Sequence, residues 1–304
     1  MYLRFLTVVL LIFSSLLGFT KNKGFIRILH ITDLHIDYFY LFSRDYYRNI
    51  FLLKSNIDLI RPDVVILSGD IFEFGEGIFS SLNYSIFTNI FHFSNGNFYF
   101  DNDREIPLYV IPGNHEYHSF FKLSYNDIPN YKRFFGSVLR NYFVDFDYVR
   151  IVFLDTGYDY YFSPWANNNI LPEPESTGIT YDQILFLEKS LSCSYEKLKI
   201  IVTHHPFLNY ESGIEEGVFL FYRKEFYEIL DKYNVNLVIS GHTHNNKVYD
   251  INTNLVKSFP IYLDRIAFVQ TGSIGKNGWY RVIDVFSNKI VVYASSNVDY
   301  FLLR

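Results

Sequence analysis

Five short polar motifs in this chain contain residue types that bind metal ions. They supply carboxylate, imidazole and amide side chains, and six of the nine histidines fall within them. Nitrogen and oxygen ligands without thiolate suit Mn²⁺, Fe, Zn²⁺ or Co²⁺. Two ions about 3.5 to 4 Å apart, joined by a shared carboxylate, accommodate so many ligands, and this is the geometry of two-metal hydrolysis. The motifs are Asp33-Leu34-His35, Gly69-Asp70, Gly113-Asn114-His115-Glu116, His204-His205 and Gly241-His242-Thr243-His244.

The spacing within the motifs favours a common site. Asp33 and His35 are two positions apart, and so are His242 and His244, so in extended backbone both side chains of each pair leave the same side of the chain. Glycine stands beside the polar residues in three motifs, where the missing Cβ permits a sharp turn and a close approach of backbone to a ligand. A single histidine beside a strand is more often structural than a ligand. Five motifs of this kind together favour ligands.

Each motif follows a short apolar run that predicts a buried strand. Between several runs lie helical patterns, one over Thr180 to Leu191 with a capping box of Thr180 and Gln183, and one over Tyr222 to Tyr233. Strands that alternate with helices imply an α/β fold, in which ligands gather outside the carboxyl ends of the strands. Residues 248–293 read mostly as strand and turn, so a mixed sheet or a pair of packed sheets is expected. The predicted strands are Ile26 to Ile31, Val64 to Leu67, Leu108 to Ile111, Val149 to Leu154, Lys199 to Val202, Leu237 to Ile239, Ile266 to Val269 and Ile290 to Tyr293.

Composition restricts the class of protein. The chain has 304 residues, of which 49% are hydrophobic and 19% charged, and this excludes a disordered chain and a membrane protein with many spans. A net charge of −5 provides no basic field for a polyanion, so general nucleic-acid binding is not expected. The single Cys193 cannot form an intrachain disulfide and is too little thiol for a zinc ribbon or an iron–sulfur cluster.

The N-terminus has the pattern of an export signal. Arg4 precedes the uncharged run Phe5 to Thr20, which lies between the length of a signal-peptide core, about 7 to 15 residues, and that of a spanning helix, about 20. The best cleavage site, Gly18-Phe19-Thr20, is poor, so an uncleaved anchor stays open, as does a buried first element of the fold. We predict a signal peptide or membrane anchor over residues 1–23 and one domain over residues 24–304. The domain is then periplasmic, extracellular or membrane-anchored outside the cytoplasm.

In order and spacing the five motifs resemble the signature of the calcineurin-like metallophosphoesterase superfamily: D-x-H, G-D, G-N-H-[DE], a later His, and G-H-x-H. The match runs from Leu29 to about Tyr249. The resemblance implies a four-layer αββα sandwich, in which two mixed β-sheets are flanked by helices and carry a dinuclear metal site at their upper edge. One departure is that many relatives read G-D-x-x-D, whereas here Glu73 stands three residues after Asp70. An acid at this place is expected behind the ligands, so the change bears on specificity more than on metal binding.

The resemblance also implies the cofactors and the metal ligands. Two metal ions are expected, with Mn, Fe or Zn as candidates. Three side chains would bind each ion, and one carboxylate would bridge the two. Carried over by position, the ligands are Asp33, His35 and His244 for the first ion, Asn114, His204 and His242 for the second, and Asp70 for the bridge.

Three residues are expected at the substrate by the same resemblance. His115 resembles the residue that contacts phosphate and protonates the leaving oxygen, and Asn114 beside it would face the substrate too. Of the adjacent histidines, His204 occupies the ligand position, which leaves His205 near the substrate or in a structural role. Asp155 ends another predicted strand and is read either as a support for the site or as a turn residue.

These assignments predict a phosphoester hydrolase in which a metal-bound hydroxide attacks phosphorus. A phosphodiester is favoured, because residues 31–38 and the N-terminus look similar to extracytoplasmic, sphingomyelinase-type members, and a branch like the purple acid phosphatases is the related possibility. His204-His205-Pro206 also resembles cyclic-nucleotide phosphodiesterases. The substrate would be a small phosphoester or a lipid head group, with membrane attachment possible through the N-terminus. A phosphomonoesterase with the same site is the main alternative, and a non-catalytic scaffold is a weaker one, because a scaffold typically loses ligands.

Overall fold

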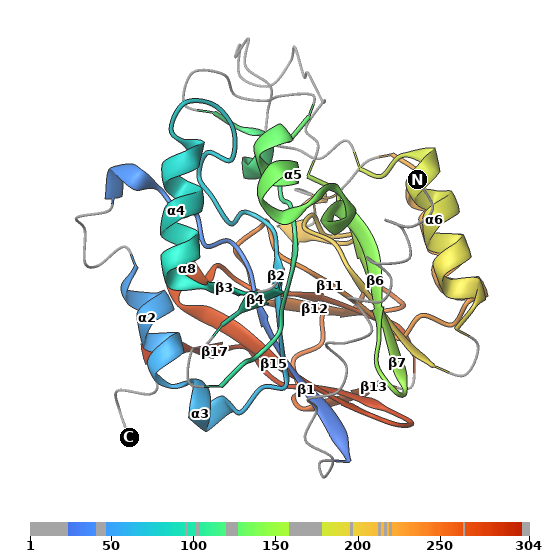
Figure 1. Cartoon of the computed structure of the whole chain (residues 1–304). Coiled ribbons are helices and arrows are strands. Elements are labelled where there is room, and N and C mark those ends of the chain that lie inside the picture. Colours follow the sequence, from blue (N-terminus) through green and yellow to red (C-terminus); the bar gives the residue numbers. More distant parts are fainter. Residues whose placement is uncertain are drawn as a thin grey trace.

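Two β-sheets pack against each other, and helices cover their outer faces in the computed structural model (Figure 1). This arrangement confirms the predicted αββα sandwich. No helix in the described part of the chain is long and apolar enough to cross a membrane. The predicted N-terminal signal or anchor, residues 1–23, lies outside the described residues. The structure describes residues 24–40, 47–94, 97–100, 104–119, 127–157, 178–194, 197–211, 214–215, 218, 221–263 and 265–299.

The first sheet has the strand order β13-β16-β15-β1-β2-β5, and β17 also pairs with β15. Strands β1, β2 and β5 run parallel, so their carboxyl ends meet at one edge. Strand β15 lies antiparallel to β1 and extends the sheet on the other side. The strands are β1 (Phe25–Ile31), β2 (Val64–Ser68), β5 (Leu108–Ile111), β13 (Ile261–Leu263), β15 (Trp279–Phe286), β16 (Ile290–Val292) and β17 (Ser296–Asn297).

The second sheet has the order β12-β14-β11-β8-β7-β6. Its four inner strands are parallel, and β6 and β12 lie antiparallel at the edges. Two hairpins, β3 with β4 and β9 with β10, stand apart from both sheets. The strands are β6 (Asn141–Asp145), β7 (Val149–Leu154), β8 (Leu198–Val202), β11 (Leu237–Ser240), β12 (Lys247–Asp250), β14 (Ala267–Gln270), β3 (His92–Ser94), β4 (Asn97–Tyr99), β9 (Tyr210–Glu211) and β10 (Ile214–Glu215).

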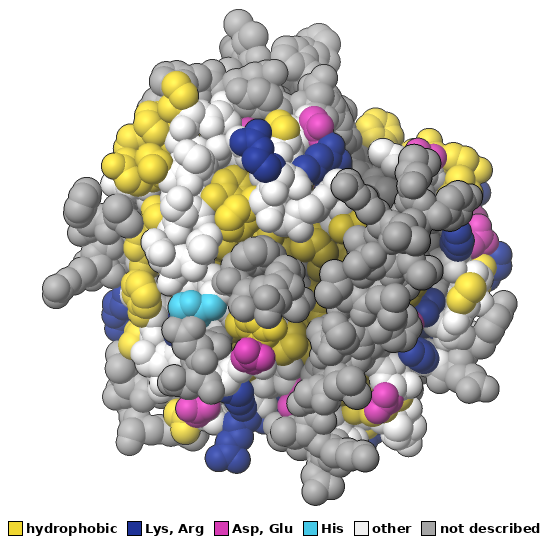
Figure 2. Space-filling model, viewed as in Figure 1, with side chains coloured by type: hydrophobic (Ala, Val, Ile, Leu, Met, Phe, Trp, Pro, Cys, Tyr) yellow, Lys and Arg dark blue, Asp and Glu magenta, His cyan; other side chains and the backbone are white. Residues whose placement is uncertain are grey.

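The helices lie on the outer faces of the sheets. In the view of Figure 2, hydrophobic side chains reach the surface over α4 and α6, and Leu82, Tyr181 and Leu185 of these helices are exposed. The predicted capping box at Thr180 is confirmed, since its side chain accepts from the backbone of Gln183. The helices are α2 (Arg48–Ser55), α3 (Ile57–Ile60), α4 (Ser80–Ile90), α5 (Pro129–Phe135), α6 (Tyr181–Ser192), α7 (Arg223–Lys232) and α8 (Ile274–Asn277), with 3₁₀ turns η2 (Tyr38–Tyr40), η3 (His115–Tyr117) and η4 (Ser137–Arg140).

Three apolar layers result from strands that are buried on both faces. In β2, Val64 and Ile66 enter the core between the sheets, whereas Val65 and Leu67 pack against the helices of the first sheet. In β7 the same alternation sends Ile151 inward, while Val152 packs in the layer under α6 and α7. Successive side chains of a strand point to opposite faces, so near-continuous apolar runs are what this sandwich requires. All eight predicted strands are confirmed to within one residue at either end.

Candidate metal centre

The metal-binding motifs meet where the carboxyl edges of the two sheets adjoin. In the first sheet they directly follow β1, β2 and β5, and in the second they follow β8 and β11. Because these strands are parallel within each sheet, their ends bring residues distant in sequence to one place. Each of the two predicted ligand groups thereby takes side chains from both sheets. The first sheet supplies Asp33, His35, Asp70 and Asn114, and the second supplies His204, His242 and His244.

An uncommon backbone conformation turns these side chains toward one another. Five of the predicted ligands have φ between 49° and 68°, in the left-handed region that non-glycine residues rarely adopt. Hydrogen bonds from the backbone N–H of Asp33 to the carbonyl of Gly69, and from that of His35 to the carbonyl of Asp70, hold two of the turns. Such strain concentrates at functional sites, where the surrounding structure maintains it. The five residues are Asp33, His35, Asp70, His242 and His244.

The first ligand group consists of Asp33, His35 and His244. Nε2 of His244 lies 3.1 Å from Nε2 of His35 and 3.3 Å from Oδ1 of Asp33. Nδ1 of His35 is 2.8 Å from Oε2 of Glu73. Burial raises the pKa of Glu73, but the hydrogen bond from His35 and the charges of His115 and His35 outweigh burial and lower this pKa to about 2. The ionised carboxylate can only accept, so Nδ1 of His35 donates and its Nε2 lone pair faces the site.

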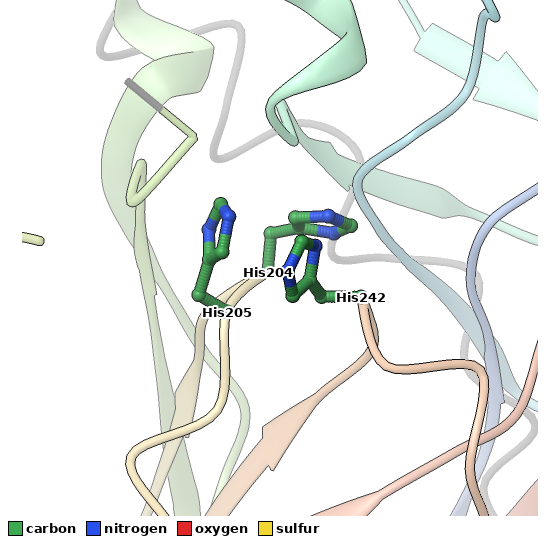
Figure 3. Close-up of side chains that lie close together, drawn as sticks. All are labelled: His204, His205 and His242. Atoms are coloured by element: carbon green, nitrogen blue, oxygen red, sulfur yellow. The ribbon is translucent and has the colours of Figure 1, made fainter. Parts of the chain in front are cut away.

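The second ligand group consists of Asn114, His204 and His242. Oδ1 of Asn114 lies 3.0 Å from Nε2 of His204 and 3.2 Å from Nδ1 of His242. Nδ1 of His204 donates to the carbonyl of Ser68 at 2.7 Å, which leaves Nε2 directed at the amide oxygen. Figure 3 shows the rings of His204 and His242 side by side at the ends of β8 and β11. Three potential metal ligands therefore converge here, and none of them is a carboxylate.

Asp70 stands between the two groups. Its Oδ1 lies 3.3 Å from Nε2 of His204, and its Oδ2 lies 3.9 Å from Nε2 of His35. The backbone N–H of His115 donates to Oδ1 at 3.0 Å and holds the carboxylate in this place. One oxygen of Asp70 thus faces each group, as a bridging ligand must.

The donor set fits metal ions on three observations. First, Oδ1 of Asp33 is buried and has no hydrogen-bond partner among the described residues, and a buried carboxylate oxygen calls for a cation. Second, candidate ligand atoms of Asp33, His35 and His244 all lie within 4.8 Å of one another, and so do those of Asp33, Asp70 and His204, close enough to share an ion. Third, glycines make the space: a Cβ on Gly69 would lie 2.5 Å from Nδ1 of His204, and one on Gly113 would strike Oδ1 of Asp70.

The charges of the cluster also favour a cation. Burial raises the pKa of Asp33, but the close approach and charge of His244, with the charge of His204, outweigh burial and lower this pKa to about 2. Burial lowers the pKa of His204, but the charge and hydrogen bond of Asp70, with the charge of Asp33, outweigh it and raise this pKa to about 10. Burial also raises the pKa of Asp70, but the charges of His204 and His115 outweigh burial and hold this pKa well below its usual value, so both carboxylates stay ionised at neutral pH. Metal binding must compete with protonation of His204, so it is coupled to proton release.

His115 and His205 differ in their placement. The side chain of His115 is 21% exposed, and its Nε2 lies 3.9 Å from Oδ2 of Asp70 at the rim of the cluster. His205 is fully buried beside His242, so it does not face solvent as a surface substrate contact would. Asp155 accepts from Tyr117 and from Arg140 at 2.6 Å. The charge of Asp155 is thus balanced by Arg140, and neither of these partners is a predicted metal ligand.

Two residues at the site were not given a role from the sequence. The carboxylate of Glu116 accepts the backbone N–H groups of Asp70, Ile71 and Phe72 at 2.9 to 3.0 Å, so it fixes the turn that carries Asp70, the predicted bridge. The sequence shows Glu116 as the last residue of the motif G-N-H-E. It does not show that the side chain acts by accepting backbone N–H groups of a distant segment. His118 packs against His115 with ring centroids 4.8 Å apart. The one hint in the sequence that His118 lies near His115 is their spacing of three positions, which one 3₁₀ turn spans.

The sequence of this chain matches a family model and is similar to that of a named protein. The family model described as calcineurin-like phosphoesterase matches residues 26–246. A protein of Vesicomyosocius okutanii named a probable cyclic nucleotide phosphodiesterase is 22% identical over 219 residues, 71% of this chain and 78% of its own.

Among solved structures, GAP50, the anchor in the inner membrane complex of Plasmodium, superposes with a TM-score of 0.57 at 16% identity, over 89% of this chain and 84% of its own. A purple acid phosphatase from yellow lupin, Lupinus luteus, gives 0.56 at 16% identity, over 90% of this chain and 54% of its own. At these identities the two structures establish the shared fold alone.

Proposed function

The chain belongs to the calcineurin-like phosphoesterase family, and from that premise we propose that it hydrolyses phosphodiesters with two bound metal ions. The observation that carries the proposal is the convergence of three oxygen donors and four imidazoles, from both sheets, on one buried cluster. Asp33, His35 and His244 would hold one ion, and Asn114, His204 and His242 the other, with Asp70 between them. Two ions held there would supply Lewis acidity toward phosphoryl oxygens and would lower the pKa of a bound water. The donor chemistry suits Mn²⁺, Fe or Zn²⁺.

His115 is the proposed acid. Its Nδ1 lies 2.9 Å from the carbonyl oxygen of Glu73, which can only accept, so Nδ1 carries a proton. Nε2 then carries a second proton only when the ring is cationic, and it lies on the side of Asp70. In that form Nε2–H can donate to a phosphate oxygen and then pass its proton to the leaving oxygen.

The charges around the cluster favour a diester over a monoester. Among the described residues, no Lys or Arg forms an ion pair with Asp33, Asp70 or Glu73, and Lys276 exerts only a longer-range attraction on Glu73. A diester carries one negative charge, whereas a monoester carries close to two at neutral pH and gains more from cationic side chains. The name of the Vesicomyosocius relative, a probable cyclic nucleotide phosphodiesterase, supports the same choice.

Hydrolysis of paired aryl esters tests the proposal. The full chain, loaded with Mn²⁺, is assayed with bis(4-nitrophenyl) phosphate and 4-nitrophenyl phosphate, and then with cyclic nucleotides and glycerophosphodiesters. We expect faster cleavage of the diester, and a loss of more than about 100-fold in Asn114→Ala, which removes one ligand of the second group. A preference for the monoester would replace the proposal with a phosphomonoesterase. If a chain with two Mn²⁺ bound cleaved none of these esters, the hydrolase proposal would fail.

We also propose that the catalytic domain acts outside the cytoplasm. The support is the sequence pattern alone: Arg4 followed by the uncharged run Phe5 to Thr20. N-terminal sequencing of the protein from fractionated expressing cells tests this. A mature chain that begins near residue 21 identifies a cleaved signal, an intact chain in the membrane fraction identifies an anchor, and an intact chain in the soluble cytoplasm contradicts export.

A further inference from the structure

His30 is a fully buried histidine that belongs to none of the five metal-binding motifs. It lies in β1, three residues before Asp33. Ile28 of this strand enters the core between the two sheets, and because successive side chains of a strand point to opposite faces, His30 enters the same layer. Ser68 in β2 follows Ile66 inward in the same way. The apolar layer between the sheets therefore ends in polar side chains at the edge that bears the metal-binding motifs.

Both ring nitrogens of His30 contact hydroxyl groups. Nε2 lies 2.8 Å from Oγ of Ser68, and Nδ1 lies 2.8 Å from Oγ1 of Thr271, which follows β14 of the other sheet. Burial, together with the charge of Arg281, lowers the pKa of His30 to about 3, so the ring is neutral at neutral pH. A neutral ring has one donating and one accepting nitrogen, and a hydroxyl group can partner either of them. His30 therefore connects the two sheets by hydrogen bonds beside the metal centre.

The contact with Ser68 leads to the second ligand group. Ser68 is the last residue of β2, and its carbonyl accepts from Nδ1 of His204 at 2.7 Å and from the hydroxyl of Thr32 at 3.3 Å. The bond at Nδ1 directs Nε2 of His204 at the amide oxygen of Asn114. Ser68 thus binds His30 through its side chain and orients His204 through its carbonyl. Partners of this kind fix the ring of a metal-binding histidine and tune its affinity for the metal.

The contact with Thr271 leads to the same ligand group from the second sheet. The backbone N–H of Thr271 donates to the carbonyl of Ser240 at 3.1 Å. Ser240 is the last residue of β11, two positions before His242. A single side chain thereby joins the strand end that supports His204 to the one that leads to His242. In the first ligand group it is Glu73 that supports a histidine ring.

We infer that His30 is a positioning residue of the second metal position, and that it acts through Ser68 on the ring of His204. The inference rests on the proposed function for the presence of two metal ions. Both nitrogens of His30 face hydroxyl groups, so the residue is not itself a ligand. Without the bond at Nε2, Ser68 gains freedom at the end of its strand, and the ring of His204 gains freedom with it. An ion that must first order its ligand binds more weakly, because the cost of ordering reduces the affinity.

Two substitutions at position 30 separate the bond to Ser68 from the general effect of removing a buried ring. The amide of His30→Gln reaches the place of Nε2 and can keep this bond, whereas the shorter His30→Asn reaches the place of Nδ1 and keeps only the bond to Thr271. The two Mn²⁺ affinities of the full chain are measured by titration calorimetry, and Asn114→Ala identifies the step of the second position. We expect that step to be about 10-fold weaker in His30→Asn and close to wild type in His30→Gln, with the other step unchanged in both.

Further variants test the same bond from its other end. Ser68→Ala removes the hydroxyl and should weaken the same step to the same extent, and the double variant His30→Asn/Ser68→Ala should bind no more weakly than either single one. His92→Asn, at a half-buried histidine of the β3–β4 hairpin, is the matched control and should change neither step. The urea midpoints of His30→Asn and His30→Gln should lie close together, so a difference in stability does not account for a difference in metal affinity.

Several results would overturn the inference. Unchanged affinities in His30→Asn or in Ser68→Ala would show that the ring of His204 does not depend on this bond. Equal losses in His30→Asn and His30→Gln, or equal losses at both metal positions, would show that His30 contributes to packing alone. If His30→Asn fails to fold, Ser68→Ala decides the matter by itself.

Failure of this inference is distinguishable from failure of the proposed function, because metal binding is measured without catalysis. A chain that binds two Mn²⁺ and cleaves no ester can still show the dependence on His30. Ester cleavage together with a second step that ignores His30 would retain the hydrolase and reject the positioning role. A wild-type chain that binds only one Mn²⁺ would contradict both.

Discussion

The two ligand groups of the cluster are built alike but differ in charge and support. The first, Asp33, His35 and His244, contains a carboxylate, and a second carboxylate, Glu73, holds the ring of His35 from behind. The second, Asn114, His204 and His242, contains no carboxylate, and a backbone carbonyl supports the ring of His204. His244 is also partly exposed, with 26% of its side chain accessible, whereas His204 is fully buried.

The difference indicates that the two groups attract cations unequally. The first group carries its own negative charge, so it would attract a divalent ion even before the charge of Asp70 is counted. The second group depends on Asp70 for charge, and an ion there must also displace the proton that Asp70 and Asp33 favour on His204. We therefore expect the first position to fill at lower metal concentration than the second.

Removal of the shared carboxylate should have the largest effect. Asp70→Asn keeps the shape of the bridge but removes the charge on which the second group depends. We expect fewer than two Mn²⁺ per chain, with the second ion lost first, and a loss of activity of more than about 100-fold. Metal analysis after gel filtration and ester hydrolysis measure both. Asp58→Asn, at a side chain that is 85% exposed, is the matched control. Retention of two tightly bound ions by Asp70→Asn would contradict the comparison.

Removing the carboxylate that holds His35 should lower the metal affinity of one position and leave that of the other unchanged. Glu73→Gln preserves the size of the residue behind His35 but replaces an ionised acceptor with an amide. Loss of such a partner typically lowers metal affinity about 10- to 100-fold. We expect that loss at the tighter of the two positions alone, read from two-step Mn²⁺ titrations. Glu105→Gln, at an exposed position, should leave both steps unchanged. An equal loss at both positions would show that the groups are not independent.

The smallest effect is expected outside both groups, at Glu76. This buried carboxylate accepts the backbone N–H of Asn130 in the first turn of α5 at 2.8 Å. Burial raises its pKa to about 7. The folded chain therefore holds this proton more tightly than the unfolded chain, whose glutamates titrate near pH 4.3. The free energy of unfolding contributed by Glu76 is greatest below that pH and falls as the pH rises through about 7.

Glu76→Gln removes this titration while keeping a carbonyl acceptor for α5. Relative to the variant, the wild type should lose stability between pH 5 and pH 8, as measured by urea midpoints at both pH values. Mn²⁺ binding should be the same in both proteins, because Glu76 contacts neither ligand group. A wild-type midpoint that rises relative to the variant over this interval would show that Glu76 is ionised when folded.

The sequence alone predicted the strands that bear the motifs, because each is an apolar run that ends in a polar turn. It read residues 248–293 mostly as strand and turn but did not delimit β15, the longest of the described strands, since Arg281 and Asp284 interrupt its apolar pattern. The structure shows why these charges are tolerated: Asp284 pairs with Arg27 of β1 at 2.7 Å, and Arg281 donates to the carbonyls of Gln270 and Tyr293. Hydrogen-bond and ion-pair partners from other parts of the chain cannot be recognised from the local sequence.

The same reason limits what could be predicted of the site. The candidate ligands could be identified because their residue types are unusual at strand ends. Their supports could not, because Glu116 acts through backbone N–H groups and Ser68 holds His204 through its carbonyl from another strand end, 136 positions away in sequence. Ser68 is a common residue type in a common place. Only its position in the fold gives it a role.

Five predicted ligands adopt a left-handed backbone conformation that the site requires but that lowers the stability of the fold. They are Asp33, His35, Asp70, His242 and His244. Each of these side chains stands where the backbone alone would favour glycine, at a cost of about 1 to 2 kcal/mol per residue. Selection for higher stability of the metal-free protein would therefore favour substitutions at these five positions first. A lineage released from catalysis should drift toward glycine or asparagine there, gaining stability as it loses its ligands.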